Sequence, residues 1–276
     1  MKIGVVAPGG PISPETGRKL LGLAADLYPD GRLDIWLHPQ CFATSGHFAG
    51  DDSVRAQAFV DVANDAGVDA VWLARGGYGS FRLIDTVLPR LHAAARRKIF
   101  LGYSDGGALL GALYGARVGR VAHGPMPADL ARRGGEAAVS RALAFLVDGE
   151  TAALEPSVAP LAPTAAFNIT ILAHLIGTPY LPDLAGHVLM LEEVSEAMYR
   201  IDRALGQITS APAIRRVAGI RLGRCSDIPA NHPDFGHGED EVARYWCERS
   251  AIPYLGRADI GHDVDNKVVP FGSWRP

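Results

Sequence analysis

The chemistry that this sequence could carry begins at residues 102–106, which read GYSDG. They fit the pattern G-x-S-x-G, follow the short apolar run 99–101 and lead into a helical pattern at 108–113. A strand that enters a helix through glycines makes a tight turn, and the residue at its apex is held in a strained conformation. We therefore expect an exposed Ser104 hydroxyl with the backbone N–H of Asp105 beside it, ready to bind an oxyanion. This arrangement is typical of acyl transfer through a serine.

A serine nucleophile needs a base that takes its proton. Among nine histidines, His262 follows an apolar stretch and a glycine, where a loop at a strand end would present such a base. The alternative is an ordinary loop histidine. His232 and His237 are possible metal ligands, but no recognised ligand spacing supports them, so no metal site is predicted.

The base in turn needs an acid that fixes its tautomer. Glu192 and Glu193 close the apolar run 189–191, and a carboxylate there is costly to desolvate unless it has a partner. The alternative is that both begin a solvated loop or cap the following helix. Periodicity alone does not distinguish Glu192 from Glu193. The chain order serine, acid, histidine is one in which such triads occur.

A second glycine-rich segment, 75–79, reads RGGYG. It has neither the dinucleotide fingerprint nor the P-loop spacing, so we do not expect nucleotide binding there. Glycines allow the backbone to approach a ligand closely, with N–H groups facing it. We expect the Gly77 N–H to be the second oxyanion donor.

Composition restricts the class of protein. The chain has 276 residues, of which 48% are hydrophobic and 21% charged, as in ordinary globular proteins. A formal net charge of −3 provides no basic field for nucleic acid, and no apolar run is long enough to span a membrane. The N-terminus lacks the features of a signal peptide, and three cysteines without CxxC spacing suit a reducing compartment. We therefore expect a cytoplasmic protein whose thiols are structural.

Residues 1–147 are expected to form one α/β domain. The predicted strands lie at 3–7, 33–37, 70–74, 99–102 and 120–122, and the predicted helices at 15–28, 53–65, 80–91 and 108–114. Apolar strands that alternate with amphipathic helices predict a parallel sheet covered on both faces. In such sheets the chemistry lies beyond the carboxyl ends of the strands.

Residues 148–165 hold three prolines and read as an interdomain linker, which leaves 166–276 as a smaller C-terminal domain. In it we predict a helix at 166–176, a strand at 187–191, a helix at 196–209 and a strand at 220–223. The tail 258–272 is predicted to be strand, loop, strand.

Together these stretches resemble the serine LD-carboxypeptidases, the murein tetrapeptide carboxypeptidase family. The matching stretches occur in the family's order and span nearly the whole chain: 6–8, 47–52 with Arg55, 75–79, 102–105, 123–126, 191–194, 199–203 and 261–262 with Asn266, Pro270 and Gly272. Two positions depart from the pattern. Ala166-Phe167 stands where the family often has Gly-Gly, and Glu193 where the acid is usually followed by Asp.

The resemblance implies a catalytic triad of Ser104, Glu192 and His262, and it favours Glu192 because the family's acid is the first carboxylate after the apolar strand. It implies a Rossmann-like N-terminal domain that carries the serine. A smaller α/β domain would bring the glutamate and the histidine to the interface between the two, often in a homodimer.

The reaction that the resemblance implies is release of terminal D-alanine from an L-centre of a murein tetrapeptide, a small peptide substrate, in cell-wall recycling. It needs no metal or organic cofactor. An exopeptidase must also bind the free carboxylate, and Arg75 is the candidate because a guanidinium binds carboxylates bidentately. The alternative is that Arg75 braces its loop through a structural ion pair.

The sequence raises three other functions, two of which it disfavours. A branch of the same family hydrolyses peptidyl-nucleotide antibiotics and gives its host self-immunity. An α/β-hydrolase esterase is disfavoured because its oxyanion motif precedes the nucleophile, whereas His123-Gly124 follows Ser104. A ligand-binding module without activity is disfavoured by the Ser, Glu and His at all three expected positions.

Overall fold

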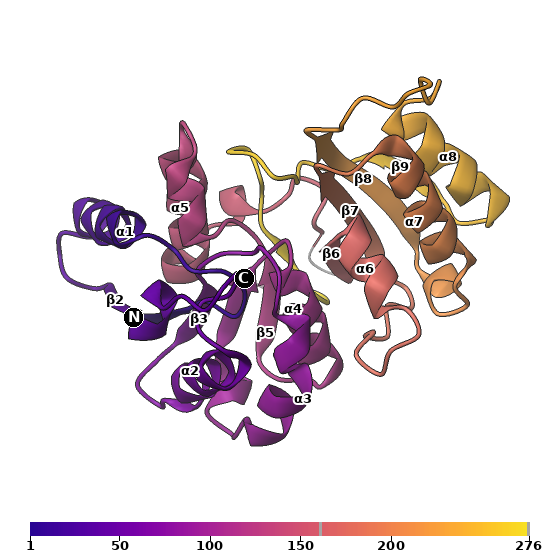
Figure 1. Ribbon diagram of the computed structural model, residues 1–276. Coiled ribbons are helices and arrows are strands. Elements are labelled where there is room, and N and C mark those ends of the chain that lie inside the picture. Colours follow the sequence, from indigo (N-terminus) through magenta and orange to yellow (C-terminus); the bar gives the residue numbers. More distant parts are fainter. Residues whose placement is uncertain (160–161, 275–276) are drawn as a thin grey trace.

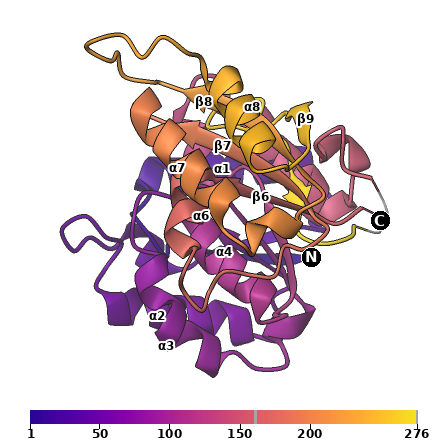
Figure 2. The ribbon, with the colours of Figure 1, turned by 90° about the vertical axis from the view of Figure 1, so that its right-hand side faces the viewer.

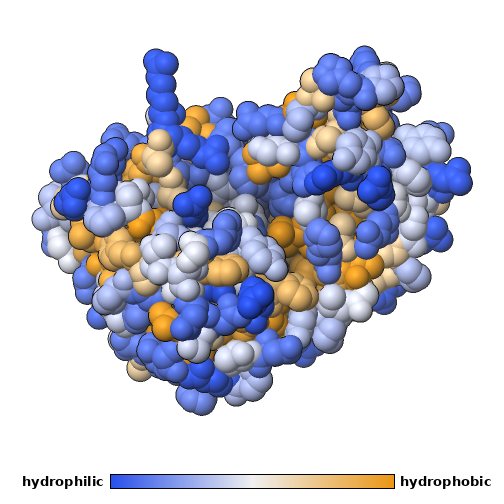
Figure 3. Space-filling model, in the orientation of Figure 1, coloured by the Kyte–Doolittle hydropathy of each residue, from blue (hydrophilic) through white to orange (hydrophobic). Residues whose placement is uncertain are grey.

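The computed structural model describes residues 1–159 and 162–274, which form two α/β lobes side by side (Figure 1). Each lobe is built on its own sheet, one of six strands and one of four. The prediction of two α/β units, the larger of them first in the chain, is confirmed. Figure 3 shows that the surface is hollowed between the lobes.

The first sheet has the strand order β10-β5-β4-β3-β1-β2. Its strands are β1 (Lys2–Val6), β2 (Asp34–Leu37), β3 (Ala70–Leu73), β4 (Ile99–Gly102), β5 (Arg120–His123) and β10 (Val269–Pro270). The five strands from the first half of the chain run parallel, and β10 pairs antiparallel with β5. The two central strands, β3 and β4, are buried throughout, as expected for a sheet covered on both faces.

Helices pack on both faces of this sheet. The helices are α1 (Pro14–Leu27), α2 (Asp52–Asn64), α3 (Ile84–Val87), α4 (Gly106–Gly115) and α5 (Gly135–Leu143). Val71 and Leu73 join the core on the α2 and α4 side, whereas Trp72 joins the core on the α1 and α5 side. This alternation follows from the two-residue period of a strand.

The second sheet is parallel and has the order β6-β7-β8-β9. Its elements are β6 (Thr164–Asn168), α6 (Ile169–Leu175), β7 (Val188–Val194), α7 (Met198–Ser210), β8 (Gly219–Ser226), α8 (Glu239–Arg249) and β9 (Tyr254–Arg257). Figure 2 shows α6, α7 and α8 in front of this sheet. At Gly111 of α4 an added Cβ would lie 3.1 Å from the Phe167 ring, so α4 packs tightly against the second lobe.

Several predicted elements were wrong in type or extent. The predicted helix 166–176 is a buried strand, β6, followed by the shorter α6, whose N-cap is Asn168. The predicted helix 80–91 is a series of short turns around α3. The tail forms only the short strand β10, and α5, α8 and β9 were not predicted.

The segment between the sheets and the end of the chain tie the two lobes together. Residues 160–161, within the predicted linker 148–165, lie outside the described residues, and β6 begins at Thr164. Leu154 forms a bridge with Val268, and β10 then enters the first sheet. No helix in the described parts of the chain is both long enough and apolar enough to cross a membrane.

Candidate active site

Ser104 lies at the turn between β4 and α4, as expected, and has a positive φ of 58°. A residue other than glycine pays a steric penalty in this left-handed region. The glycines on either side are required by Leu73 of the neighbouring strand. An added Cβ would lie 2.8 Å from the Leu73 side chain at Gly102 and 2.6 Å from it at Gly106. The G-x-S-x-G pattern therefore lets β3 and α4 pack closely beneath a strained serine.

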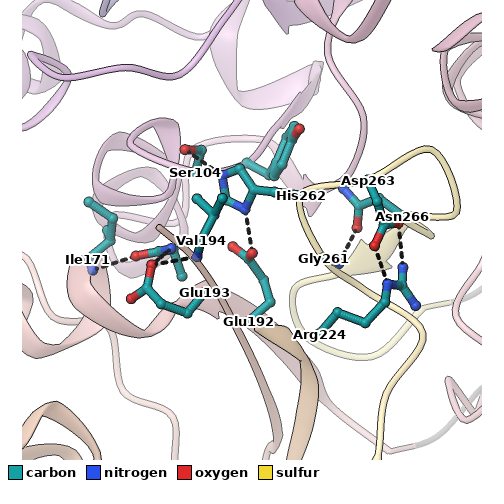
Figure 4. Close-up of polar contacts among 12 residues, drawn as sticks. Ser104, Ile171, Glu192, Glu193, Val194, Arg224, Gly261, His262, Asp263 and Asn266 are labelled. Carbon is teal, nitrogen blue, oxygen red and sulfur yellow. Dashed lines mark hydrogen bonds and ion pairs between the residues drawn. The ribbon is translucent and has the colours of Figure 1, made fainter. Parts of the chain in front are cut away.

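The structure brings Ser104, His262 and Glu192 into one hydrogen-bonded chain (Figure 4). His262 Nε2 lies 2.9 Å from Ser104 Oγ, and His262 Nδ1 lies 2.5 Å from Glu192 Oε2. A carboxylate only accepts, so Nδ1–H donates to Glu192 and the Nε2 lone pair accepts from the serine hydroxyl. This is the geometry of a nucleophile, a base and an orienting acid.

Two opposing effects act on the pKa of His262. Burial lowers the pKa because it penalises the charged imidazolium, whereas the charge of Glu192 and its hydrogen bond raise it. The net direction is upward from the ordinary value. Glu192 itself is fully buried, and its Oε1 has no partner among the described residues. The carboxylate is thus directed at the imidazole alone.

The loop that carries His262 is fixed at several points. Asn266 Oδ1 accepts from the Gly261 N–H at 3.2 Å and lies 3.2 Å from His123 Nε2. Burial lowers the pKa of His123 to about 4, so this ring is neutral and donates through Nε2–H. Arg224 holds the loop from the other side, with Nη1 2.6 Å from Asp259 and ion pairing to Asp263.

Glu193 has a different set of partners from Glu192. Its carboxylate accepts from Asn168 Nδ2 at 2.5 Å, from Val194 N at 2.9 Å, and from both N and Oγ1 of Thr170 at 2.9 and 2.7 Å. Burial raises its pKa, and these donors lower it. Glu193 therefore anchors the start of α6, and none of these hydrogen bonds involves His262.

The glycine-rich loop that follows β3 lies directly against Ser104. Asp105 clamps this loop, because its carboxylate accepts from Ser80 N at 2.9 Å and from Gly79 N at 3.3 Å. At Gly76 an added Cβ would lie 2.8 Å from both Cβ and Oγ of Ser104. Gly76 is thus the residue through which the loop approaches the hydroxyl.

Replacing Gly76 by alanine is expected to lower kcat by about 10²-fold, since displacing a reacting group by about 1 Å costs that much. The added methyl group must push Ser104 or the loop away. Steady-state kinetics would measure the loss. Gly22→Ala is the matched control, because nothing lies within 4 Å of an added Cβ there. Unchanged kcat in Gly76→Ala would contradict the contact.

Arg55 braces the same loop from below. Its guanidinium is fully buried, with Nε 3.2 Å from the Gly50 carbonyl and Nη1 3.0 Å from the Gly79 carbonyl. Nη1 also donates to Pro8 O, and Nη2 pairs with Asp52. One side chain thus joins the loops that follow β1 and β3.

Arg55→Met is expected to lower the free energy of unfolding by roughly 3 kcal/mol, because it leaves buried carbonyls without a donor. Urea denaturation would measure this change. Arg18, exposed on α1, is the control, and Arg18→Met should change the stability by less than about 0.5 kcal/mol. Equal stabilities of the two variants would show that Arg55 does not brace the loop.

A cleft of about 480 Å³ opens over Ser104 and His262. Gly77 and Arg75 both line it. Arg75 is exposed and donates to the Pro11 carbonyl at 3.2 Å, and it forms no ion pair within the described residues. The alternative role of Arg75, a structural ion pair that braces its loop, therefore has no acidic partner in the described part of the chain.

The sequence analysis missed Arg132, which also lines the cleft and donates to the main-chain oxygen of His262. Tyr103, Asp129 and Met126 line the cleft as well. Arg132 had no local signal, because it lies in an exposed polar segment 130 residues before its partner. His232 and His237 lie in the loop before α8, and no trio of metal-ligating side chains occurs in residues 1–159 and 162–274.

Comparison with known proteins identifies the family. The LD-carboxypeptidase N-terminal domain matches residues 3–124, and the LD-carboxypeptidase C-terminal domain matches residues 163–275. The chain belongs to the LD-carboxypeptidase family. This LD-carboxypeptidase is therefore a serine-type peptidase and a hydrolase.

Individual relatives agree with this assignment. A carboxypeptidase-like protein of Streptomyces coelicolor is 36% identical over 98% of this chain and 88% of its own length. The murein tetrapeptide carboxypeptidase of Pseudomonas aeruginosa is 27% identical over 87% of this chain and 82% of its own.

Solved structures have the same fold. The muramoyltetrapeptide carboxypeptidase from Oxalobacter formigenes has a TM-score of 0.79 and 25% identity, over 98% of this chain and 93% of its own. The microcin C7 self-immunity protein bound to aspartyl sulfamoyl adenosine has a TM-score of 0.78 over 99% of this chain and 96% of its own. At 17% identity, the second match shows the fold alone.

Proposed function

We propose that this LD-carboxypeptidase releases D-alanine from a murein tetrapeptide through an acyl-enzyme on Ser104. The observation that carries the proposal is the 2.9 Å and 2.5 Å chain from Ser104 through His262 to Glu192. Ser104 Oγ attacks the carbonyl of the L-centre while His262 Nε2 takes its proton. The same proton then passes to the departing amine of D-alanine. A water, activated by His262, hydrolyses the ester and returns Ser104 to its starting state.

Glu192 acts through the imidazole. By accepting from Nδ1–H it keeps the Nε2 lone pair directed at the serine, and its charge stabilises the imidazolium that forms during attack. The backbone N–H groups of Asp105 and Gly77 hold the developing oxyanion. Two features support this role: Asp105 begins α4 beside the nucleophile, and the loop that contains Gly77 contacts Ser104 through Gly76. One such donor contributes about 3–4 kcal/mol to transition-state stabilisation.

Arg75 binds the terminal carboxylate of the peptide. Its guanidinium lines the same cleft as Ser104, and only one of its N–H groups donates within the described part of the chain, to Pro11 O. The other N–H groups form the planar fork that a carboxylate accepts from. A carboxypeptidase needs such a group because it acts only at a free chain end. The names of the Pseudomonas and Oxalobacter relatives support a murein tetrapeptide as the substrate.

Mass spectrometry of a tetrapeptide incubated with the enzyme tests this function. The wild-type protein should release D-alanine, whereas Ser104→Ala, Glu192→Ala and His262→Ala should leave the peptide intact on the same time scale. An unchanged tetrapeptide after prolonged incubation with the wild-type protein would refute the assignment of the substrate.

A self-immunity hydrolase that cleaves peptidyl-nucleotide antibiotics is the second candidate. One observation favours it beside the shared fold. A second cleft of about 560 Å³, which Gly77 also lines, is bordered by the aromatic rings of Tyr78 and Phe81. Aromatic rings are surfaces on which a nucleobase stacks. Incubation with an acyl-adenylate analogue in parallel with the tetrapeptide separates the two, because only this candidate would release the nucleotide.

A further inference from the structure

A cavity of about 260 Å³ lies at the amino ends of β3, β4 and β5, at the opposite end of the first sheet from Ser104. The pairing of these strands places charged residues side by side. Asp69 precedes β3, Lys98 precedes β4, and Arg120 begins β5. The Arg120 N–H donates to the Lys98 carbonyl at 2.8 Å. Arg97, the neighbour of Lys98 in the chain, lines the same cavity.

The charges around this cavity are unequal. Its described lining residues include three cations, Arg97, Lys98 and Arg120, and one carboxylate, Asp69. Asp69 Oδ2 already accepts from a main-chain N–H of β1 at 2.7 Å. The Arg120 guanidinium lies 5.7 Å from the centre of the Trp274 ring, and neither arginine forms an ion pair within residues 1–159 and 162–274. The cavity therefore has a net positive charge with no protein group to balance it.

Lys98 is the unusual member of this group, because it is only 2% exposed. Its Nζ donates to the main-chain oxygen of Asp65 at 2.6 Å and to that of Val68, just after α2. Both acceptors are uncharged, and an ammonium group has a third N–H. Burial lowers the pKa of Lys98, against the weaker opposing effect of Asp65 and Asp69. A buried cation with no ion pair in the described part of the chain favours an anion beside it.

We propose that this cavity is a binding site for a phosphate group, either inorganic phosphate or the phosphate of a small metabolite. A phosphate monoester carries about −1.5 to −2 charge near pH 7 and has three strong acceptor oxygens. Arg97 and Arg120 would bind these oxygens through their planar forks, and Lys98 would supply a point charge from below. Because the cavity is separate from the cleft over Ser104, the inference does not depend on the proposed peptidase reaction.

Occupation of this site would stabilise the folded chain. The three cations come together only when β3, β4 and β5 are paired, so the unfolded chain has no equivalent site. A ligand that binds the folded state alone shifts the unfolding equilibrium in proportion to the logarithm of its concentration above its Kd. Phosphate should therefore raise the Tm of the protein at constant ionic strength.

Titration calorimetry with inorganic phosphate tests the site, with sodium chloride holding the ionic strength constant because salt screens exposed charges. We expect about tenfold weaker binding in Arg97→Gln and in Arg120→Gln, since each loses a charge-assisted hydrogen bond. Arg96→Gln is the matched control, because Arg96 is exposed, precedes Arg97 and does not line the cavity. Arg75→Gln removes a cation from the cleft over Ser104 and should leave the phosphate affinity unchanged.

Thermal unfolding provides a second measurement. Phosphate should raise the Tm of the wild-type protein and of Arg96→Gln, and raise that of Arg97→Gln much less. Lys98→Met should abolish binding, and the two arginine variants decide the question if it does not fold. A parallel titration with glycerol phosphate distinguishes the sources: tighter binding than inorganic phosphate supports a phosphorylated metabolite, and equal or weaker binding supports inorganic phosphate.

Three results would overturn the inference. The first is that neither inorganic phosphate nor glycerol phosphate binds. The second is that Arg97→Gln and Arg120→Gln bind phosphate as tightly as Arg96→Gln does. The third is that binding disappears in Arg75→Gln, which would place the phosphate in the cleft over Ser104 instead.

Discussion

Replacing Ser104 by alanine is expected to lower kcat by about 10⁶-fold, because removing the nucleophile of a serine triad eliminates the acyl-enzyme route. The remaining activity would come from the oxyanion donors and from substrate binding. D-alanine release measured over long incubations, with the tetrapeptide in excess, gives the size of the loss. Binding of the tetrapeptide should persist, since the hydroxyl contributes little to ground-state affinity.

Ser210→Ala serves as the control for this substitution. Ser210 is exposed at the end of α7, and it is far in sequence from the residues that line the cleft. Its hydroxyl makes no hydrogen bond to the described residues. Its replacement should leave kcat unchanged. If Ser104→Ala retained even a hundredth of the wild-type rate, a different group would have to be the nucleophile.

Glu192→Gln is expected to lower kcat by about 10³–10⁴-fold, because the amide does not hold the imidazole in its reactive tautomer. It should also change the pH dependence. His262 acts as a base only when it is neutral, so the rate falls as the pH drops through its pKa. That pKa is raised from its ordinary value, since the contacts with Glu192 outweigh the opposing effect of burial, and the acid limb of kcat/KM is raised with it.

In Glu192→Gln the charge that raises the pKa of His262 is lost, while the burial that lowers it remains. The acid limb should therefore move to lower pH, and pH profiles of kcat/KM for both proteins measure the shift. If the acid limb of kcat/KM lies at the same pH in Glu192→Gln as in the wild-type protein, a group other than Glu192 sets the pKa of His262.

Glu193→Gln provides the contrast, because the neighbouring carboxylate accepts four hydrogen bonds that do not involve His262. A side-chain amide there turns an N–H toward buried donors and should cost about 1–3 kcal/mol of stability. Thermal unfolding measures this loss. We expect the acid limb of kcat/KM to move less than in Glu192→Gln. The reverse pattern would exchange the roles of the two glutamates.

The nucleophile was predictable because its signal is local. Ser104, its two flanking glycines and the apolar strand before it are contiguous. The structure confirms the turn, and the positive φ of Ser104 agrees with the strained conformation expected there. The parallel strands of the first sheet were predictable for a similar reason, since each of them lies in a short contiguous run that the sequence analysis identified as a strand.

The two glutamates could not be distinguished by pattern. Both lie within β7, and neighbouring residues of a strand point to opposite faces. Which of them lies beside a histidine depends on the position, in the folded protein, of the loop after β9, about 70 residues later in the chain. The family resemblance favoured Glu192, and the hydrogen bond to His262 agrees with that choice.

The sequence pattern predicts a helix where β6 lies, because the apolar residues of β6 continue without a break into α6. A short run of this kind fits a buried strand and a buried helix equally well. The boundary is set by Asn168, whose side chain accepts from Ile171 N at 3.1 Å and so starts the helix after the strand ends. Arg132 lay outside any pattern, because its contact with His262 exists only in the folded chain.

The pairing of β10 with β5 has a consequence for how the enzyme is made. The sheet that carries Ser104 takes its sixth strand from residues 269–270, just after the loop that contains His262. While a ribosome is still producing the first half, the nascent chain contains neither His262 nor Glu192, and its sheet is one strand short. If Ser104, Glu192 and His262 act together as proposed, we expect fragments that end before Pro270, left by premature termination or by proteolysis, to have no peptidase activity.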